Sequence, residues 1–420
     1  MTTTAPTRSF LAPSPTSAVP PIADPAKPVQ WRPLASIGVL GAALVTYVAL
    51  AHGAQQAVLL ALGVGLGVAL FHSRFGFTSA WRQLVAVGNG AGLRAHAVLL
   101  GTTATLFALV IGTGTGLFGS TPEPSAGPLG VGLVLGAFLF GIGMQLGGAC
   151  ASGTLFAVGS GQGTIVLTLF GFIAGSVLYT WGYPLVDDLP ALPAVVLADH
   201  VGWFGSWVVT IAALLVVVAI SRAVQARRNP PPTGVPPTAR GVARILRGSW
   251  PLWVGGVALA ALGGAVPLVS GGAWGITSAF ALWGAKALQA IGLHPETWAY
   301  WQQPGQAKAL AGPVLADKTS LTDIGIMIGA AVAATTGGAW VLHRSIPWRT
   351  ALAAVLGGII MGVGARLASG CNIGAYLAGI ASGSLSGWIW GLAALAGTWI
   401  GLRGRRLFGL ANPTPTDAVC

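Results

Sequence analysis

Two cysteines occur in similar settings far apart in this sequence of 420 residues. Cys150 lies in the stretch GGACASGTLF, and Cys371 lies in ASGCNIGAYL. The chain has 3 cysteines, and the third, Cys420, is its last residue. Cysteine packs well as a small apolar residue, so a single buried cysteine would indicate only core packing. Two cysteines among Gly, Ser and Asn in matching motifs instead indicate a pair of thiols with a shared role.

The motifs around the two cysteines align without a gap. GIGMQLGGACASG at 141–153 matches GVGARLASGCNIG at 362–374, and GFTSAW at 76–81 matches GITSAF at 275–280. Small and polar residues of these motifs form the candidate substrate path together with Cys150 and Cys371: Gly148, Ser152, Gly153, Ser369, Gly370, Asn372, Gly374, Thr78, Ser79, Thr277 and Ser278. A disulfide between the two thiols remains an alternative. We expect no metal site and no cofactor, because no further His or Cys stands at zinc-ligand spacing.

Three basic residues lie near these motifs within apolar sequence: Arg82, Lys286 and Arg366. A charge inside a membrane is costly and usually functional, although Arg82 and Arg366 can also extend to an interface. Asp and Glu total 9, and none is expected in the middle of a membrane span; Asp323 is expected at the start of one. We therefore expect a site that favours anions or uncharged solutes.

The composition requires a membrane protein. Only 7% of the residues are charged and 54% are hydrophobic, with a mean hydropathy of +0.76. Soluble domains carry about 25% charged residues. Lipid permits only helices or closed barrels, and no barrel-like alternation is visible, so we predict an all-α polytopic membrane protein. The net charge of +12 falls in short loops, which is typical of membrane topology and not of nucleic-acid binding.

Ten apolar stretches are long enough, at about 17–23 residues, to cross a hydrocarbon core of about 30 Å. They are 34–51, 55–71, 95–117, 129–147, 164–182, 203–220, 251–270, 322–342, 350–368 and 385–402. We expect 75–90 and 275–290 to be short broken or re-entrant helices around a central path. The expected organisation is a disordered cytoplasmic tail (1–33), a first transmembrane repeat (34–182), an external loop (183–202), a second repeat (203–403) containing a cytoplasmic linker (221–249), and a cytoplasmic tail (404–420).

The charges of the loops predict the orientation. The linker 221–249 contains six arginines and no acid, which indicates a cytoplasmic loop. The loop 183–202 contains three aspartates and no Lys or Arg, which indicates an external loop. Both termini are then cytoplasmic, and the halves form an inverted 5+5 repeat with its site near the bilayer midplane. Broken helices in such a site expose N-terminal amides that attract anions.

The motifs resemble the YeeE/YedE family of bacterial inner-membrane transporters of sulfur compounds. The resemblance rests on GIGMQLGGACASGTL, GFTSAWRQL and GVGARLASGCNIGAYLAGIASGSLSGWIWGLAALAGTWIGLR, and it covers nearly the whole chain after residue 34. It implies a multi-pass inner-membrane protein that admits thiosulfate, with Cys150 and Cys371 passing the anion on through S–H···S contacts. It also implies a cytoplasmic sulfur-carrier protein as recipient. The family's third cysteine is expected in the first short motif, where this chain has only Thr78 and Ser79 as polar residues.

The leading hypothesis is uptake of thiosulfate or a closely related sulfur anion. A neutral thiol is a weak, soft hydrogen-bond donor, which suits a terminal sulfur atom and allows its release. Some relatives are associated with selenium compounds, and the missing third cysteine leaves a selenium or other sulfur compound open. The alternative from another class is a membrane sulfurtransferase that forms a persulfide on one cysteine, although we predict no enzyme.

Overall fold

The computed structural model describes residues 28–230, 241–342 and 345–414, which are largely helical. In the first half the elements are α1 (Trp31–His52), α2 (Ala54–Ser73), α3 (Phe77–Val87), α4 (Ala91–Val110), β1 (Leu129–Gly130), α5 (Val131–Leu146), α6 (Ala151–Gly159), α7 (Gly163–Trp181), η1 (Tyr183–Leu185) and β2 (Ala191–Leu192). In the second half they are α8 (Ala198–Arg228), α9 (Val242–Arg247), α10 (Leu252–Ser270), α11 (Thr277–Ala290), η2 (Pro295–Thr297), α12 (Ala299–Gln302), α13 (Pro304–Ala311), η3 (Val314–Ala316), α14 (Lys318–Thr336), α15 (Trp348–Leu367), the π-helix η4 (Asn372–Leu377), α16 (Ala378–Ala381), α17 (Leu385–Gly404) and η5 (Arg405–Phe408).

Within the described ranges, 10 helical segments are long and apolar enough to cross a membrane. Each of the ten stretches expected from the sequence overlaps one of these segments. The predicted all-α polytopic class is therefore confirmed. Three of the segments are broken: α2 continues into α3, α5 into α6, and α15 into η4 and α16.

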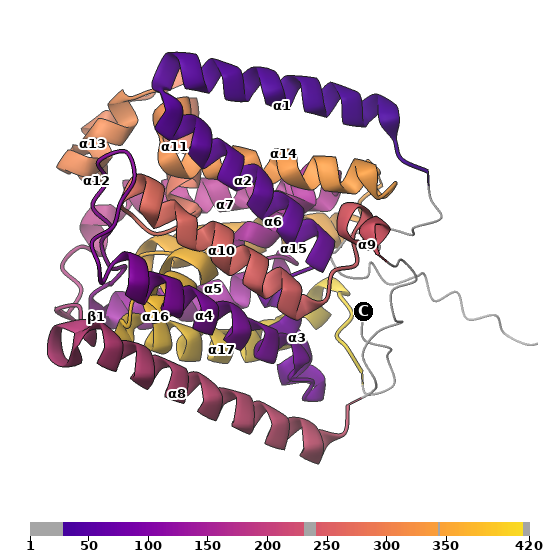
Figure 1. Ribbon diagram of the computed structural model, residues 1–420, viewed down its shortest axis with the longest axis vertical. Helices are drawn as coiled ribbons and strands as arrows, with labels where there is room; N and C mark the ends of the chain where they lie inside the picture. The colour runs from indigo at the N-terminus through magenta and orange to yellow at the C-terminus, as the bar shows by residue number, and fades with distance from the viewer. Residues whose placement is uncertain (1–27, 231–240, 343–344, 415–420) are drawn as a thin grey trace, which may run out of the picture.

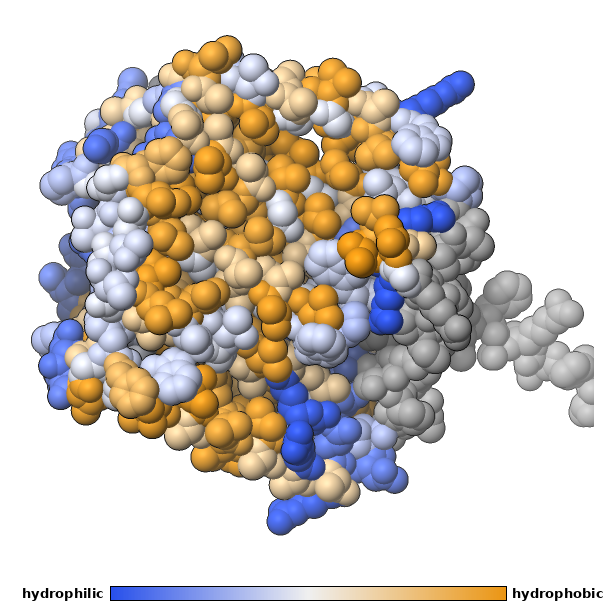
Figure 2. Space-filling view, viewed as in Figure 1, coloured by the Kyte–Doolittle hydropathy of each residue, from blue (hydrophilic) through white to orange (hydrophobic). Residues whose placement is uncertain are grey.

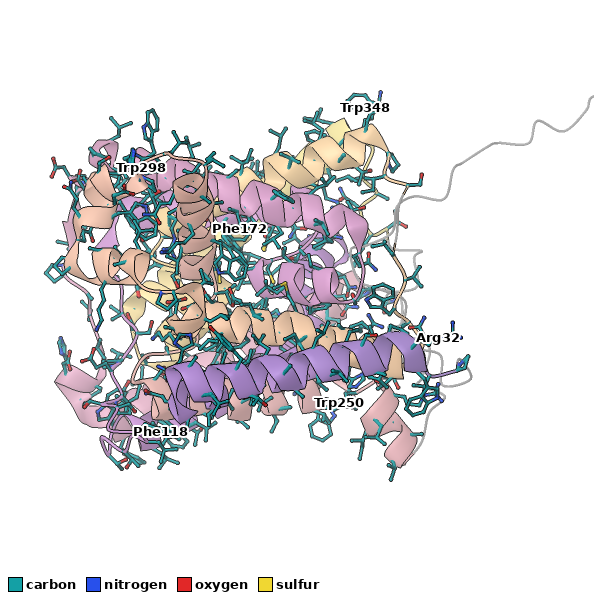
Figure 3. The ribbon with its side chains drawn as sticks, turned by 90° about the horizontal axis from the view of Figure 1, so that it is seen from above. Arg32, Phe118, Phe172, Trp250, Trp298 and Trp348 are labelled. Carbon is teal, nitrogen blue, oxygen red and sulfur yellow. The ribbon has the colours of Figure 1, made fainter. Side chains whose placement is uncertain are left out.

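The axes of the long helices are roughly aligned, and α1 and α8 lie on opposite outer edges (Figure 1). Both described ends of the chain lie at one end of the molecule, which we call the terminus end. The opposite end carries α12, α13 and β1, and we call it the α12 end. Figure 3 shows Arg32, Trp250 and Trp348 at the terminus end, Phe118 and Trp298 at the α12 end, and Phe172 between them.

The outer surface is apolar where lipid would contact it. Leu40 and Leu50 on α1 are 70% and 84% exposed, and Phe204 on α8 is 78% exposed. Figure 2 shows a broad hydrophobic face bordered by hydrophilic residues. Such a surface is stable against lipid, whereas it would aggregate in water.

The halves pack against each other through reciprocal helix pairs. α7 packs on α15 as α5 packs on α17, and α2 packs on α14 as α4 packs on α10. Glycines allow close approach of the backbones: a Cβ built on Gly63 would lie 2.5 Å from the carbonyl oxygen of Thr322. If each helix is replaced by its counterpart in the other half, the α7–α15 contact becomes the α5–α17 contact and the α2–α14 contact becomes the α4–α10 contact. An internal repeat is expected to show such pairs of equivalent contacts.

Helix α14 starts earlier than the expected span at 322–342. Asp317 is its N-cap, and its side chain accepts a hydrogen bond of 2.7 Å from the Ser320 amide. The helix therefore begins at Lys318, and Asp323 lies inside it with 0% exposure. The sequence placed Asp323 at the start of a span, and the Asp317 cap is the reason that this placement was wrong.

Other boundaries also differ from the expected ranges. α4 ends at Val110, because glycines follow, and Gly114 has a positive φ of 66°. α8 extends into both flanking loops and bends at Gly202, where φ is 70°. The expected tail 1–33, linker 221–249 and tail 404–420 lie partly outside the described residues, and Cys420 lies wholly outside them.

Candidate anion path

The backbone makes the same turn before each cysteine. Gly148 and Ser369, which align in the two motifs, have φ values of 83° and 58° in the left-handed region. Cys150 and Cys371 then adopt extended conformations, with φ and ψ of −84° and −175° and of −101° and −165°. Each cysteine is the N-cap of the helix that follows, α6 or η4. The aligned motifs therefore share a left-handed residue two positions before an extended cysteine, although Gly370 has a positive φ of 152° and η4 is a π-helix where α6 is an α-helix.

A side chain from a neighbouring helix holds each turn in place. On α7, the Thr168 hydroxyl donates a hydrogen bond of 2.9 Å to the carbonyl of Gly147. On α17, the Trp390 indole N–H donates one of 3.2 Å to the carbonyl of Gly370. Both donors are fully buried. Each bond satisfies a carbonyl that the break in the helix would otherwise leave unpaired.

The two thiols lie in one buried core. Cys150 and Cys371 are each 1% exposed, and both are free, so a disulfide between them is excluded. The helices that they cap contact each other. Neither cysteine side chain forms a cap hydrogen bond to its helix. Ser152 Oγ lies 3.5 Å from Cys150 Sγ, and a Cβ built on Gly153 would lie 3.4 Å from that sulfur.

A cavity of about 340 Å³ adjoins the Cys371 turn. It is lined by Glu123, Pro124, Ser125, Gly272, Ala273, Trp274, Gly275, Ile276, Thr277, Ser278, Lys318, Thr319, Arg366, Ser369, Gly370 and Gly374. Six of the residues predicted from the sequence therefore meet here: Thr277, Ser278, Arg366, Ser369, Gly370 and Gly374. The nearest atom to a Cβ built on Gly374 would be Gly275 Cα, at 3.8 Å, so the helix start beside Cys371 is open towards the cavity.

Two cations line this cavity. Arg366 donates hydrogen bonds of 3.0 Å to the Thr277 hydroxyl and 3.2 Å to the Tyr300 hydroxyl, and its Nε is buried without a partner in the described structure. Lys318 is the second cation, and the exposed carboxylate of Glu123 is the acid in the lining. Lys318 was not predicted from the sequence. The feature that could have indicated it is its position directly after Asp317, the N-cap of α14. The balance of charge in the cavity favours an anion.

A second buried cation lies near the other turn. Arg82 Nε donates a hydrogen bond of 3.0 Å to Gln145 Oε1, and the amide of Gln145 donates one of 3.4 Å to the Thr78 carbonyl. Arg405 donates a bond of 2.7 Å to the Gln145 carbonyl. Gln145 aligns with Arg366 in the two motifs. Each half therefore has one guanidinium that ties its short helix to the helix before its cysteine.

The remaining predicted residues lie outside the cavity. Lys286 is half-buried on α11 and is not part of the lining, so the structure does not bring it to the cations Arg366 and Lys318. Ser79 donates a hydrogen bond of 3.2 Å to the Gly76 carbonyl. By contrast, Thr78 Oγ1 and both amide atoms of Asn372 are buried and have no partner among the described residues. Unpaired buried polar atoms are rare, and these two side chains are free to contact a ligand.

Across residues 28–230, 241–342 and 345–414, no group of 3 or more His, Cys, Asp and Glu side chains is gathered.

In the described part of the chain, ten segments long and apolar enough to cross a membrane, two helix breaks with a cysteine at the N-cap position and a positively charged cavity define the class as a polytopic membrane transport protein. The model of a family described as Sulphur transport matches residues 72–400. The chain belongs to this family, which is the YeeE/YedE family, and the resemblance seen in its motifs is thereby confirmed.

Named relatives agree with this assignment. Over 359 residues the chain is 26% identical to "Thiosulfate transporter TsuA" of Spirochaeta thermophila, covering 81% of this chain and 96% of that protein. Over 352 residues it is 27% identical to the protein of the same name from Escherichia coli, covering 81% and 92%. It is also 34% identical over 135 residues to "Probable transporter YedE" of Escherichia coli, a match that covers 32% of this chain and only 33% of that protein.

Proposed function

We propose that the protein takes up thiosulfate, or a closely related sulfur anion, across the bacterial inner membrane through a path lined by Cys371 and Cys150. The observation that carries this proposal is the cavity that Arg366 and Lys318 make positive and that reaches the turn before Cys371. Support also comes from relatives named as thiosulfate transporters that match 81% of this chain.

The charges of the loops give the direction. The α12 end carries the loop 183–202 with its three aspartates, and the terminus end carries Arg227 and Arg228 in the last turn of α8 and Arg244 and Arg247 on α9. Positive loops stay in the cytoplasm, so the cavity faces outward and both termini are cytoplasmic. The two halves then have opposite orientations. An anion entering through the cavity meets Cys371 first and Cys150 later, with Arg82 and Arg405 towards the cytoplasm.

Charge decides how such an anion can cross. Moving one negative charge into a cell against an inside-negative potential costs about 2.3 kcal/mol per 100 mV, and a dianion bears twice that. Cations at both ends of the path and the amides at the starts of α6 and η4 offset part of the substrate's charge. The neutral thiols add weak contacts to the terminal sulfur, which hold the anion without trapping it.

Two further roles follow from the family resemblance. Thr78 and Ser79 stand where a third cysteine is expected, and the unpaired Thr78 hydroxyl is the better candidate donor to the anion. A cytoplasmic sulfur-carrier protein would receive the substrate at the terminus end.

The test is uptake of labelled thiosulfate by cells that lack their own uptake systems. Wild type, Cys150→Ser and Cys371→Ser would be compared at matched membrane abundance, with Thr46→Val on the exposed face of α1 as control. We expect uptake by the wild type and the control, and at least about a tenfold loss in each serine variant, equivalent to about 1.4 kcal/mol. Wild-type activity in both serine variants would contradict the cysteine path. Absence of thiosulfate uptake with uptake of a selenium compound would change the substrate.

A further inference from the structure

Asp323 is a buried carboxyl group with no role in the path described so far. It is 0% exposed, and neither of its carboxyl oxygens has a hydrogen-bond partner in the described part of the chain. A carboxylate ion buried without a partner is strongly unfavourable, so the empty protein holds this group in its neutral, protonated form. A protonated carboxyl does not repel an anion, and it can donate a hydrogen bond.

Asp323 lies one helical turn below the cavity. Thr319 lines the cavity, and its hydroxyl accepts a hydrogen bond of 3.0 Å from Ser278. Residues four apart share one face of a helix, and side chains tilt towards the N-terminus of their helix. The carboxyl of Asp323 therefore points along α14 towards Thr319. Helix α14 also contacts α6, the helix that follows Cys150.

The other half has a buried protonatable residue at the same place. His96 is the sixth residue of α4, as Asp323 is of α14, and it is 1% exposed. A Cβ built on Gly256 would lie 3.3 Å from the carbonyl before His96, and one built on Gly63 would lie 2.5 Å from the carbonyl before Asp323. The His96 ring packs 4.3 Å from the ring of Phe77. Among the described residues, His96 Nδ1 is also buried without a hydrogen-bond partner, but the ring packs on an aromatic neighbour, whereas neither oxygen of Asp323 has a partner.

The groups around α14 leave Asp323 without a counter-charge. Helices α1, α2, α6, α9 and α11 and the segment η3 pack on α14. Their titratable and charged groups, with those at their ends and on α14 itself, are Arg32, Tyr47, His52, His72, Arg74, Cys150, Arg244, Arg247, Lys286, Asp317 and Lys318. Of these, Asp317 interacts electrostatically with Asp323 and has the same sign. His72 lies nine residues beyond Gly63 along α2, about 13 Å away along the helix axis. Arg74, the C-cap of α2, lies further along the chain from Gly63 than His72 does.

We propose that Asp323 is the proton-binding group of the path, so that a proton enters with each sulfur anion. The protonated carboxyl releases its proton to the side opposite the cavity in the cycle that carries the anion. The carboxylate left behind then takes up one proton from the cavity side, so one proton moves inward and the protein returns to its starting state. This inference rests on the proposed function, because the co-transported anion is the one named there.

The test uses the full chain, purified and placed in lipid vesicles that contain a pH-sensitive dye. Labelled thiosulfate is added outside, and label uptake and lumen pH are followed together. We expect the wild type to acidify the lumen, with uptake rising by up to about tenfold per unit fall in external pH where proton binding limits the rate. Asp323→Asn should take up label down its gradient, with acidification at least tenfold weaker and no dependence on pH.

Two variants serve as controls. Asp323→Glu retains a carboxyl group and should retain proton entry. This variant keeps the proposal testable if Asp323→Asn does not fold. Asp317→Asn removes an acid from the same helix but keeps a good N-cap, and it should behave as wild type.

The outcomes separate the two proposals. Label uptake by the wild type without acidification, or wild-type acidification in Asp323→Asn, would overturn this inference alone. A folded Asp323→Glu that has lost proton entry would also overturn it. No label uptake by the wild type would overturn the proposed function and this inference with it.

Discussion

Arg366 donates a hydrogen bond of 3.0 Å to the hydroxyl of Thr277, and this bond joins the helix before Cys371 to the first turn of α11. The first half makes the equivalent connection with different residues. There Arg82 comes from the short helix, and Gln145 occupies the position that aligns with Arg366. Each half thus has a guanidinium near its cysteine turn, buried for Arg82 and half-buried for Arg366, although the arginine comes from a different helix. In the first half the arginine is Arg82, which comes from α3 and is buried. In the second half it is Arg366, which comes from α15 and lines the cavity.

Replacing Arg366 by Lys should weaken uptake of thiosulfate. An ammonium is a compact donor and cannot span the hydroxyls of Thr277 and Tyr300 as the guanidinium does. We expect the concentration for half-maximal uptake to rise by about tenfold, which corresponds to about 1.4 kcal/mol. Labelled uptake at a series of thiosulfate concentrations measures this change. Lys286→Gln is the matched control, because Lys286 lies outside the cavity lining and should leave uptake unchanged.

Thr78→Val should separate stability from transport. The Thr78 hydroxyl is buried without a hydrogen-bond partner, so its removal should leave stability unchanged or raise it by about 1–3 kcal/mol. If this hydroxyl contacts the anion, uptake falls in the same variant, whereas Thr78→Cys preserves or increases it. Thermal unfolding and labelled uptake measure the two effects. A Thr78→Val variant with full uptake would show that Thr78 does not replace the expected third cysteine.

Thr168→Val should loosen the turn before Cys150. The variant leaves the buried carbonyl of Gly147 without its donor, which costs about 1–3 kcal/mol. We expect a lower melting temperature in detergent and reduced uptake. Thr46→Val, which removes an exposed hydroxyl bonded within its own helix, should change neither. Equal melting temperatures for Thr168→Val and wild type would contradict the proposed role of this bond.

Glu296 should not contribute to pH dependence near neutrality. The Gln289 amide donates a hydrogen bond of 2.9 Å to its carboxylate, which with the neighbouring His294 lowers the pKa of Glu296 to about 2. A lowered pKa favours the folded state above the ordinary value of 4.5, and this contribution is lost as pH falls towards 2. Between about pH 5 and pH 8 the group stays ionised. Glu296→Gln should therefore give the wild-type pH profile of uptake in vesicles, and an altered profile would point to a coupled role for this loop.

The turns beside the two cysteines could be predicted from the sequence, because there the motif itself sets the local backbone. The Gly-rich stretch before Cys150 and the matching stretch before Cys371 contain the small residues that a sharp turn requires, and both form that turn. Ser369 shows the limit of this reasoning, because a non-glycine residue takes the left-handed conformation that Gly148 takes in the other half.

Residues that reach the site from other elements could not be assigned in this way. Lys286 and Lys318 are both basic residues near apolar stretches, yet only Lys318 lines the cavity. The difference depends on where α14 begins and on which face of α11 meets it. The segment 291–317, which contains η2, α12, α13 and η3, separates these helices in sequence, so their contact cannot be recognised from the sequence.

The sequence by itself determined the membrane class, the ten spans, the pairing of the two cysteine motifs and the resemblance to a sulfur-transport family. These features depend on composition, apolar run length and short motifs, all of which are local. Only the tertiary structure decided which cations meet at Cys371, that the thiols are free, and that Asp323 is buried without a partner. These three features depend on where each helix begins and on how helices far apart in the chain face one another. The effect of a charge on a site depends on its distance from the site and on how deeply both are buried, and neither can be read from the sequence.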